Sequence, residues 1–233
     1  MMADTDVRER YGPGDPGEAV TEKPPAPALT VADPAPLGLA AFALTTFMLS
    51  GHNVGFIPDV AWVGLALFYG GMIQLLAGMW EFRNKNVFGA TAFSTYGGFW
   101  LGLGSFVILI ELTKLGKAVT NVDDALAWFL LAFAIFNTYM LLWSARVNHA
   151  VFGVFLTLEI TEILLVVGFF DLAGGGSGAL VKIGGWAGII TAFVAWYASA
   201  AGVANSQSPT TVLPVGHPFW RFPVASGPAS PTS

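Results

Sequence analysis

The chain contains 233 residues, of which 55% are hydrophobic and only 11% are charged, and its mean hydropathy is +0.65. Soluble domains carry roughly 25% charged residues, so this composition excludes an ordinary soluble domain and predicts an integral membrane protein. The net charge of −5 and the absence of a basic cluster disfavour nucleic acid as a partner. With no cysteine and only three widely separated histidines, the sequence predicts neither a bound metal nor another cofactor.

Six long segments with few or no charges predict six membrane-spanning helices, because about 20 apolar residues are needed to cross a bilayer. We expect these spans near residues 37–55, 60–80, 87–110, 125–144, 150–170 and 183–204. All 14 prolines lie at or before Pro58 or at or after Pro209, so the helices between them are free of proline kinks. The predicted fold is therefore an all-α bundle of six transmembrane helices in a cell membrane.

The two ends of the chain differ from this core. Residues 1–32 are rich in proline, glycine, alanine and acidic residues and lack apolar periodicity, which predicts a disordered tail. Residues 33–216 then form the transmembrane domain, and residues 217–233 form a C-terminal tail. With the N-terminus in the cytoplasm, the inner segments hold Arg8, Arg10, Lys23, Arg83, Lys85, Arg146 and Arg221, and the outer loops hold Lys114, Lys117 and Lys182. Because cytoplasmic loops carry an excess of basic residues, both termini are expected in the cytoplasm.

Several classes of membrane protein need motifs that this sequence lacks. An aquaporin-like channel would carry two Asn-Pro-Ala half-helix motifs, whereas this chain has one Asp33-Pro34-Ala35 and no second copy. No predicted span contains the deep lysine of a retinal protein, and neither a His-Glu-x-x-His zinc motif nor a Gly-rich phosphate loop is present. The sequence favours a passive or ion-coupled pathway, or a structural membrane protein, over an enzyme.

The segment that opens the first span carries a distinctive signature. Asp33 is expected to cap a helix whose first residue is Pro34. The residues after Asp33, which are Pro34, Ala35, Pro36, Leu37, Gly38 and Leu39, resemble the signature of the acetate uptake transporter family, which includes the bacterial succinate–acetate permeases. The family has Asn where this chain has Asp33, a change that keeps a capping oxygen and adds a charge.

The resemblance continues in order from residue 33 to residue 216. Its motifs are His52-Asn53-Val54-Gly55, Phe68-Tyr69-Gly70-Gly71 with Gln74, Tyr96-Gly97, Gly185-Trp186 with Asn205, and Thr211-Val212-Leu213-Pro214. The resemblance implies a protomer with one pathway through six helices, assembled as a hexamer. The implied activity is transport of acetate and related short-chain mono- and dicarboxylates, generally linked to the entry of protons.

The resemblance also implies a constriction of the pathway at Phe42, Tyr96 and Leu156. Leu156 matches only if one residue is inserted between it and the preceding match at Arg146. A narrow apolar girdle obstructs hydrated ions, which suits a gate. Three large side chains in a helical bundle are also compatible with an ordinary core.

Six further residues are candidates for lining the pathway, and they are Thr45, Thr46, Gln74, Asn137, Ala195 and Asn205. The two threonines share a helical face with Phe42, and their hydroxyls either replace water around a carboxylate or bond their own helix backbone. Gln74 and Asn137 lie in mid-span and face the pathway or another helix, not lipid. Ala195 and Asn205 match positions near the family's pathway, and a small residue at 195 leaves room for substrate.

No arginine or lysine lies deep in any predicted span, so a transported carboxylate meets no buried cation. Glu159 and Glu162, which have no counterpart in the family pattern, lie three residues apart on one helical face in mid-span. Burial and mutual repulsion both favour the protonated form of a carboxyl group, so the pair is predicted to relay protons. The alternative is a neutral, hydrogen-bonded pair at a helix or subunit contact.

Two glycine pairs, Gly98 with Gly102 and Gly184 with Gly188, predict places where helices pack closely. Two other functions also stay open at this point. One is a urea, amide or other small-solute channel with a similar six-helix hexameric build. The other is a membrane sensor or structural protein that keeps the fold without transporting anything.

Overall fold

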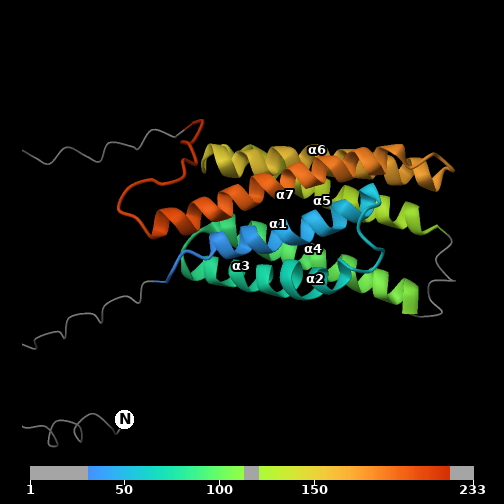
Figure 1. Cartoon of the computed structure of the whole chain (residues 1–233), viewed down its shortest axis with the longest axis horizontal. Coiled ribbons are helices and arrows are strands. Elements are labelled where there is room, and N and C mark those ends of the chain that lie inside the picture. Colours follow the sequence, from blue (N-terminus) through green and yellow to red (C-terminus); the bar gives the residue numbers. More distant parts are fainter. Residues whose placement is uncertain (1–30, 113–120, 221–233) are drawn as a thin grey trace, which may run out of the picture. The chain divides into compact units, whose positions relative to one another are not determined.

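The computed structural model describes residues 31–112 and 121–220, and within these ranges every regular element is a helix. The helices are α1 (Ala35–Val54), α2 (Val63–Leu67), the π-helix η1 (Phe68–Ile73), α3 (Gln74–Arg83), α4 (Val87–Leu112), α5 (Val122–Ser144), α6 (His149–Ala173) and α7 (Ala179–Ser206). Figure 1 shows their arrangement. Most of the tails expected at 1–32 and 217–233, together with Lys114 and Lys117, lie outside the described residues.

Among the described residues, six helical segments are long and apolar enough to cross a membrane, and they run over Ala35–Val54, Val63–Arg83, Val87–Glu111, Val122–Ser144, His149–Ala173 and Ala179–Ser206. The second of these combines α2, η1 and α3, which follow one another without a break. Each segment covers one of the spans predicted from sequence. The all-α, six-span architecture of a multi-pass membrane protein is therefore confirmed.

Polar side chains mark the starts of several helices. Asn121 and Asn148 cap α5 and α6, each accepting a hydrogen bond from the backbone N–H three residues ahead, at 3.1 and 2.8 Å. The expected start of α1 is wrong by one residue, because the helix begins at Ala35 and Pro34 is its cap residue. Asp33 Oδ1 accepts the N–H of Ala35 at 2.9 Å. Asp33 therefore still satisfies an N–H group at the helix start, although it stands one position before the cap.

The packing brings spans that are distant in sequence side by side (Figure 1). α1 lies along α7, α7 along α6, and α6 along α5, while α2, η1 and α3 cover α4, and η1 and α3 also contact α1. α4 meets α5 only locally. The sparse contact between α4 and α5 leaves the space in which the largest cavity described below is found.

The second span contains a π-helical turn. The sequence does not predict this turn, because the span contains no proline. η1 includes two buried glycines, Gly70 and Gly71. A β-carbon on Gly70 would lie 2.6 Å from Thr45 Oγ1, and one on Gly71 would lie 2.5 Å from the carbonyl oxygen of Ala66. Only glycine fits these two approaches, so Gly70 lets the turn pack against α1, and Gly71 lets it pack against Ala66 of its own span and Leu101 of α4. π-helical turns inside α-helices occur frequently at functional sites, and the buried Gln74 follows this one directly.

The two predicted glycine pairs behave differently. A β-carbon on Gly184 would lie 2.8 Å from the Leu165 side chain of α6, and one on Gly188 would collide with Ser50 Oγ of α1. This pair therefore allows α7 to approach α6 and α1. The prediction for Gly98 is wrong within the protomer, because a β-carbon there would meet nothing within 4 Å. The close approach falls instead on the adjacent Gly97, where a β-carbon would lie 2.8 Å from the backbone nitrogen of Leu75.

These two neighbouring glycines provide a matched test of helix packing. Gly97→Ala is expected to destabilise the protein by about 1–3 kcal/mol, because the added methyl group forces α3 away from α4. Gly98→Ala adds the same methyl group to open space and is expected to leave stability unchanged or slightly higher. Unfolding of both variants in detergent measures the difference, and equal stability would contradict the packing of α3 on α4 described here.

Candidate functional site

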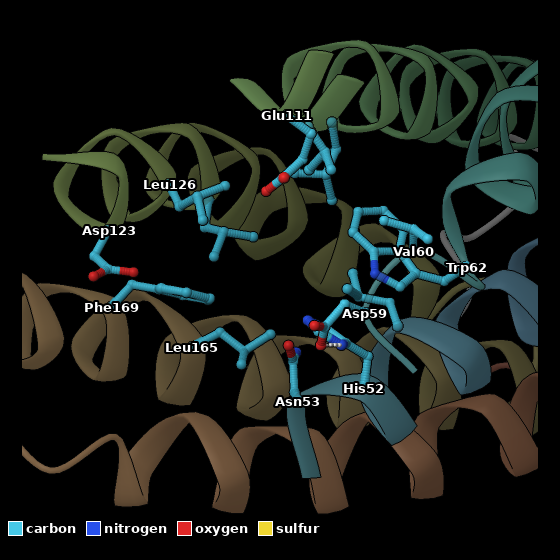
Figure 2. Close-up of a pocket in the computed structure, with 14 residues that line it drawn as sticks. His52, Asn53, Asp59, Val60, Trp62, Glu111, Asp123, Leu126, Leu165 and Phe169 are labelled. Atoms are coloured by element: carbon cyan, nitrogen blue, oxygen red, sulfur yellow. Dashed lines mark ion pairs between the residues drawn. The ribbon is translucent and has the colours of Figure 1, made fainter. Parts of the chain in front are cut away.

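A cavity of about 600 Å³, which we call the vestibule, opens among α1, α4, α5, α6 and the segment between α1 and α2. Its lining includes three carboxylates, Asp59, Glu111 and Asp123, and no lysine or arginine among the described residues. His52 Nδ1 lies 3.6 Å from Asp59 Oδ1. Figure 2 shows Glu111 reaching in from α4 while His52 and Asn53 face it from α1. The described lining of the vestibule is therefore acidic.

Two smaller cavities continue inward from the vestibule. The middle cavity, of about 40 Å³, shares Leu49, Asn53, Leu130 and Leu165 with the vestibule as common walls. The inner cavity, of about 20 Å³, lies beyond it. Shared walls place the three spaces in a row along α1, α4 and α6, with α5 lining the first two and Gln74 of α3 lining the inner one.

Phe42, Tyr96 and Leu158 form the wall shared by the middle and inner cavities, and we call these three residues the constriction. All three side chains are buried. The Phe42 and Tyr96 rings lie with their centroids 5.8 Å apart. A small solute moving from the middle to the inner cavity has to pass between these three side chains.

Leu156, the leucine expected at the constriction, lies elsewhere. Its side chain is 40% exposed and lines none of the three cavities, whereas that of Leu158 is 7% exposed and lines two. Two residues correspond to about 200° of helical rotation, so Leu156 and Leu158 lie on opposite faces of α6. Within the described protomer, Leu158 and not Leu156 therefore lies between the middle and inner cavities.

The constriction is held by a hydrogen-bonded network centred on Asn137. The Tyr96 hydroxyl donates to Asn137 Oδ1 at 2.8 Å. Asn137 Nδ2 donates to the carbonyl oxygen of Phe155 at 3.1 Å and to Glu159 Oε2 at 2.6 Å. Asn137 is fully buried and lines none of the cavities. Its amide therefore connects helices and fixes Tyr96, which is the interhelical alternative to lining the pathway.

The two adjacent threonines of α1 point in different directions. Thr45 Oγ1 donates to the carbonyl oxygen of Ala41 at 2.9 Å, and the side chain packs against Gly70. Thr46 lines the middle cavity, and its buried hydroxyl has no hydrogen-bond partner. The geometry therefore brings Thr46 to the cavities and assigns Thr45 to helix packing.

Of the other lining candidates, one reaches a cavity. Gln74 is buried, lines the inner cavity, and leaves its Oε1 without a partner. Ala195 is fully buried in the apolar core and lines none of the three cavities. Asn205 accepts the backbone N–H groups of Val212 and Leu213 at 2.8 and 3.0 Å, so it fastens the segment that follows α7.

The two glutamates of α6 also differ in their surroundings. Glu159 is partly exposed, and its carboxylate accepts hydrogen bonds from Asn137 at 2.6 Å and from Thr138 at 2.7 Å. Glu162 is 4% exposed, lines the middle cavity, and leaves its Oε2 without a hydrogen-bond partner. One carboxyl group is therefore held by donors, and the other faces the cavity.

Sequence reasoning missed Leu158 and the acidic groups of the vestibule. Leu158, Glu162 and Leu165 follow the i, i+4, i+7 spacing of one helical face, and all three line the middle cavity. That periodicity, read from Glu162, would have indicated Leu158 without any family pattern. The vestibule acids lie in different elements, so no local sequence pattern connects them.

Six spans around a row of cavities, closed by a buried constriction, define a membrane protein of the channel or carrier class. Among the described residues, no three His, Asp or Glu side chains are grouped so as to hold a metal ion. The chain belongs to the GPR1/FUN34/yaaH family, whose sequence model matches residues 16–219. The family resemblance seen in the sequence is thereby confirmed.

Three of the similar proteins are named as transporters or channels. The chain is 43% identical to acetate permease A of Emericella nidulans over 201 residues, which are 81% of this chain and 67% of that protein. It is 36% identical to the succinate-acetate/proton symporter SatP of Escherichia coli K12 over 187 residues, which are 80% of this chain and 96% of that protein. The solved structure of the bacterial acetate channel SatP matches with a TM-score of 0.73 and 35% identity, over 80% of this chain and 100% of that one.

The network around Asn137 generates a stability prediction. Asn137→Ala leaves the Tyr96 hydroxyl without its acceptor and Glu159 without one of its two donors, and an unsatisfied buried polar group costs about 1–3 kcal/mol. Thr138→Ala removes a hydrogen bond to the same glutamate from an exposed side chain and is expected to cost about 1 kcal/mol or less. Unfolding of the two variants in detergent compares them. Equal losses of stability would contradict a central role for Asn137.

Proposed function

We propose that this protein carries acetate and related short-chain mono- and dicarboxylates across the cell membrane, together with protons. The observation that carries this proposal is the row of cavities closed by Phe42, Tyr96 and Leu158. The names of the relatives, an acetate permease, a succinate-acetate/proton symporter and an acetate channel, support the choice of substrate.

The charges along the row of cavities favour passage of the acid with its proton. A carboxylic acid with a pKa of about 4–5 is mostly anionic at neutral pH. The vestibule presents three carboxylates to that anion, and the described residues around the middle and inner cavities include no lysine or arginine. A bare anion therefore finds no compensating cation beyond the vestibule, so passage through the two deeper cavities favours the neutral acid.

Polar groups on both sides of the constriction suit this passage. Thr46 offers a hydroxyl in the middle cavity, and Gln74 offers an amide in the inner cavity. Neither the Thr46 hydroxyl nor Gln74 Oε1 has a partner of its own. A carboxyl group loses its water molecules at the constriction. It can form a hydrogen bond with Thr46 on one side of the constriction and with Gln74 on the other side.

The assembly and orientation proposed here follow the family resemblance and the basic residues. We infer a hexamer with one pathway in each protomer and both termini in the cytoplasm, so the vestibule opens to the outside. Large apolar side chains exposed on the outer helix faces, such as Trp128, Ile135 and Leu142 on α5, suit contact with lipid or with neighbouring protomers. Native mass spectrometry from lipid nanodiscs tests the hexamer, and a monomer there would refute it.

Uptake of labelled acetate by proteoliposomes tests the proposed activity, with protein-free liposomes as the background. Unlabelled propionate and succinate are expected to compete, and formamide is expected not to. Competition by formamide alone would favour an amide channel instead. Uptake of methylammonium without uptake of acetate would indicate that the acidic vestibule admits a cation. No uptake of any of these solutes would favour a sensor or structural protein.

Two leucines of α6 provide a matched test of the constriction. Leu158→Ala widens the girdle between the middle and inner cavities, so uptake of succinate relative to acetate is expected to rise several-fold. Leu156→Ala removes the same atoms from an exposed face and is expected to leave that ratio unchanged. The ratio is measured in the same proteoliposomes. A change caused by Leu156→Ala and not by Leu158→Ala would overturn the assignment of the constriction.

A further inference from the structure

Glu162 is the most unusual polar group in the membrane-spanning part of the described chain. Its side chain is 4% exposed, it lines the middle cavity, and Oε2 has no hydrogen-bond partner. Buried polar groups are nearly always hydrogen-bonded, and an exception calls for an explanation. The middle cavity has about 40 Å³ of space, which is enough for one oxygen of a carboxyl group or a water molecule.

The groups that surround Glu162 are almost all neutral. α1 contributes Phe42, Thr46, Leu49, Ser50 and Asn53 to the middle cavity, and α5 contributes Leu130. α4 contributes Tyr96 together with Phe99 and Trp100, and on α7 Thr191 lies 3.1 Å from Thr161. Tyr96 and Glu159 are the titratable groups near Glu162 among the described residues of these helices. No positive side chain of the described cavity lining faces the carboxyl group.

We propose that Glu162 is the proton-binding group that a transported weak acid meets before the constriction. This inference rests on the proposed transport function and adds the residue that supplies the proton. A lone charge buried without a partner is costly, so the resting carboxyl group is neutral. It then presents an O–H donor to an arriving carboxylate, beside the Thr46 hydroxyl in the same cavity.

The proton transfer balances without any further reactant. The O–H bond of Glu162 breaks as an O–H bond forms on acetate, which leaves a carboxylate on Glu162 and a neutral acetic acid whose carboxyl oxygen reaches the middle cavity. The acid passes Phe42, Tyr96 and Leu158 and releases its proton on the far side. Glu162 takes a new proton from the vestibule, with which the middle cavity shares four residues. One acetate and one proton cross in each cycle.

Glu159 has a different role in this account, so the pair predicted from sequence does not act as one relay. Both oxygens of its carboxylate already accept hydrogen bonds, from Asn137 and Thr138. It lines none of the three cavities. Glu159 therefore anchors Asn137, which in turn holds Tyr96, and it acts as a positioning residue.

The decisive experiment measures labelled acetate and lumenal pH together in proteoliposomes. Glu162→Gln is expected to abolish the proton movement that accompanies acetate. Glu159→Gln is expected to keep the ratio of protons to acetate, whatever its effect on rate. Asp171→Asn, which removes an exposed carboxylate from the same helix, is the matched control. Wild-type coupling in Glu162→Gln would overturn the assignment, and loss of coupling in Glu159→Gln alone would transfer the role to Glu159.

A second measurement separates this inference from the proposed function. Infrared spectra of the reconstituted protein at neutral pH are expected to show the C=O band of a protonated carboxyl group that is absent from Glu162→Gln and present in Glu159→Gln. Persistence of that band in Glu162→Gln would overturn the inference even if acetate uptake is intact. If the wild type takes up no acetate, the proposed function fails and the band still decides the protonation of Glu162. Glu162→Asp keeps a carboxyl group and serves if the glutamine variant does not fold.

Discussion

The hydrogen bond from the Tyr96 hydroxyl to Asn137, at 2.8 Å, is the contact on which the rest of the site depends. Asn137 stands on α5, and its own amide binds α6 through Phe155 and Glu159. α4, which meets α5 only locally, is thereby tied to both α5 and α6 at the depth of the constriction. Because the hydroxyl is fixed from behind, the Tyr96 ring faces Phe42 and Leu158 and separates the middle cavity from the inner one.

The charge distribution along this row of cavities explains why a weak acid suits it better than an anion. The vestibule is acidic, and the described lining of the two deeper cavities offers hydroxyls, amides, aromatic rings and one buried carboxyl group. In such surroundings a charge on the moving solute is expensive, and a proton transferred from the buried carboxyl group lets the acid itself cross uncharged. The low proportion of charged residues thus has a functional consequence as well as an architectural one.

The sequence predicts the architecture well because hydrophobic length and helix start signals are local properties. All six spans could be placed from the sequence, although the predicted cap of α1 was one residue out. It predicts the site less well, because the site depends on which face of a helix meets which neighbour. Thr45 and Thr46 are adjacent, yet one bonds its own backbone and the other lines a cavity. Leu156 and Leu158 differ by a register of two residues, and Asn205 has its partners in the segment after α7. None of these outcomes follows from residue type alone.

The dependence of acetate uptake on membrane voltage tests the central claim most directly. If acetate crosses with one proton, transport carries no net charge, so uptake into proteoliposomes follows the pH gradient. It is then insensitive to a potential imposed with potassium and valinomycin. The account predicts equal initial rates with the lumen positive, negative or at zero potential. A rate that rises when the lumen is made positive, with no pH gradient present, would show a bare anion crossing and would contradict the account.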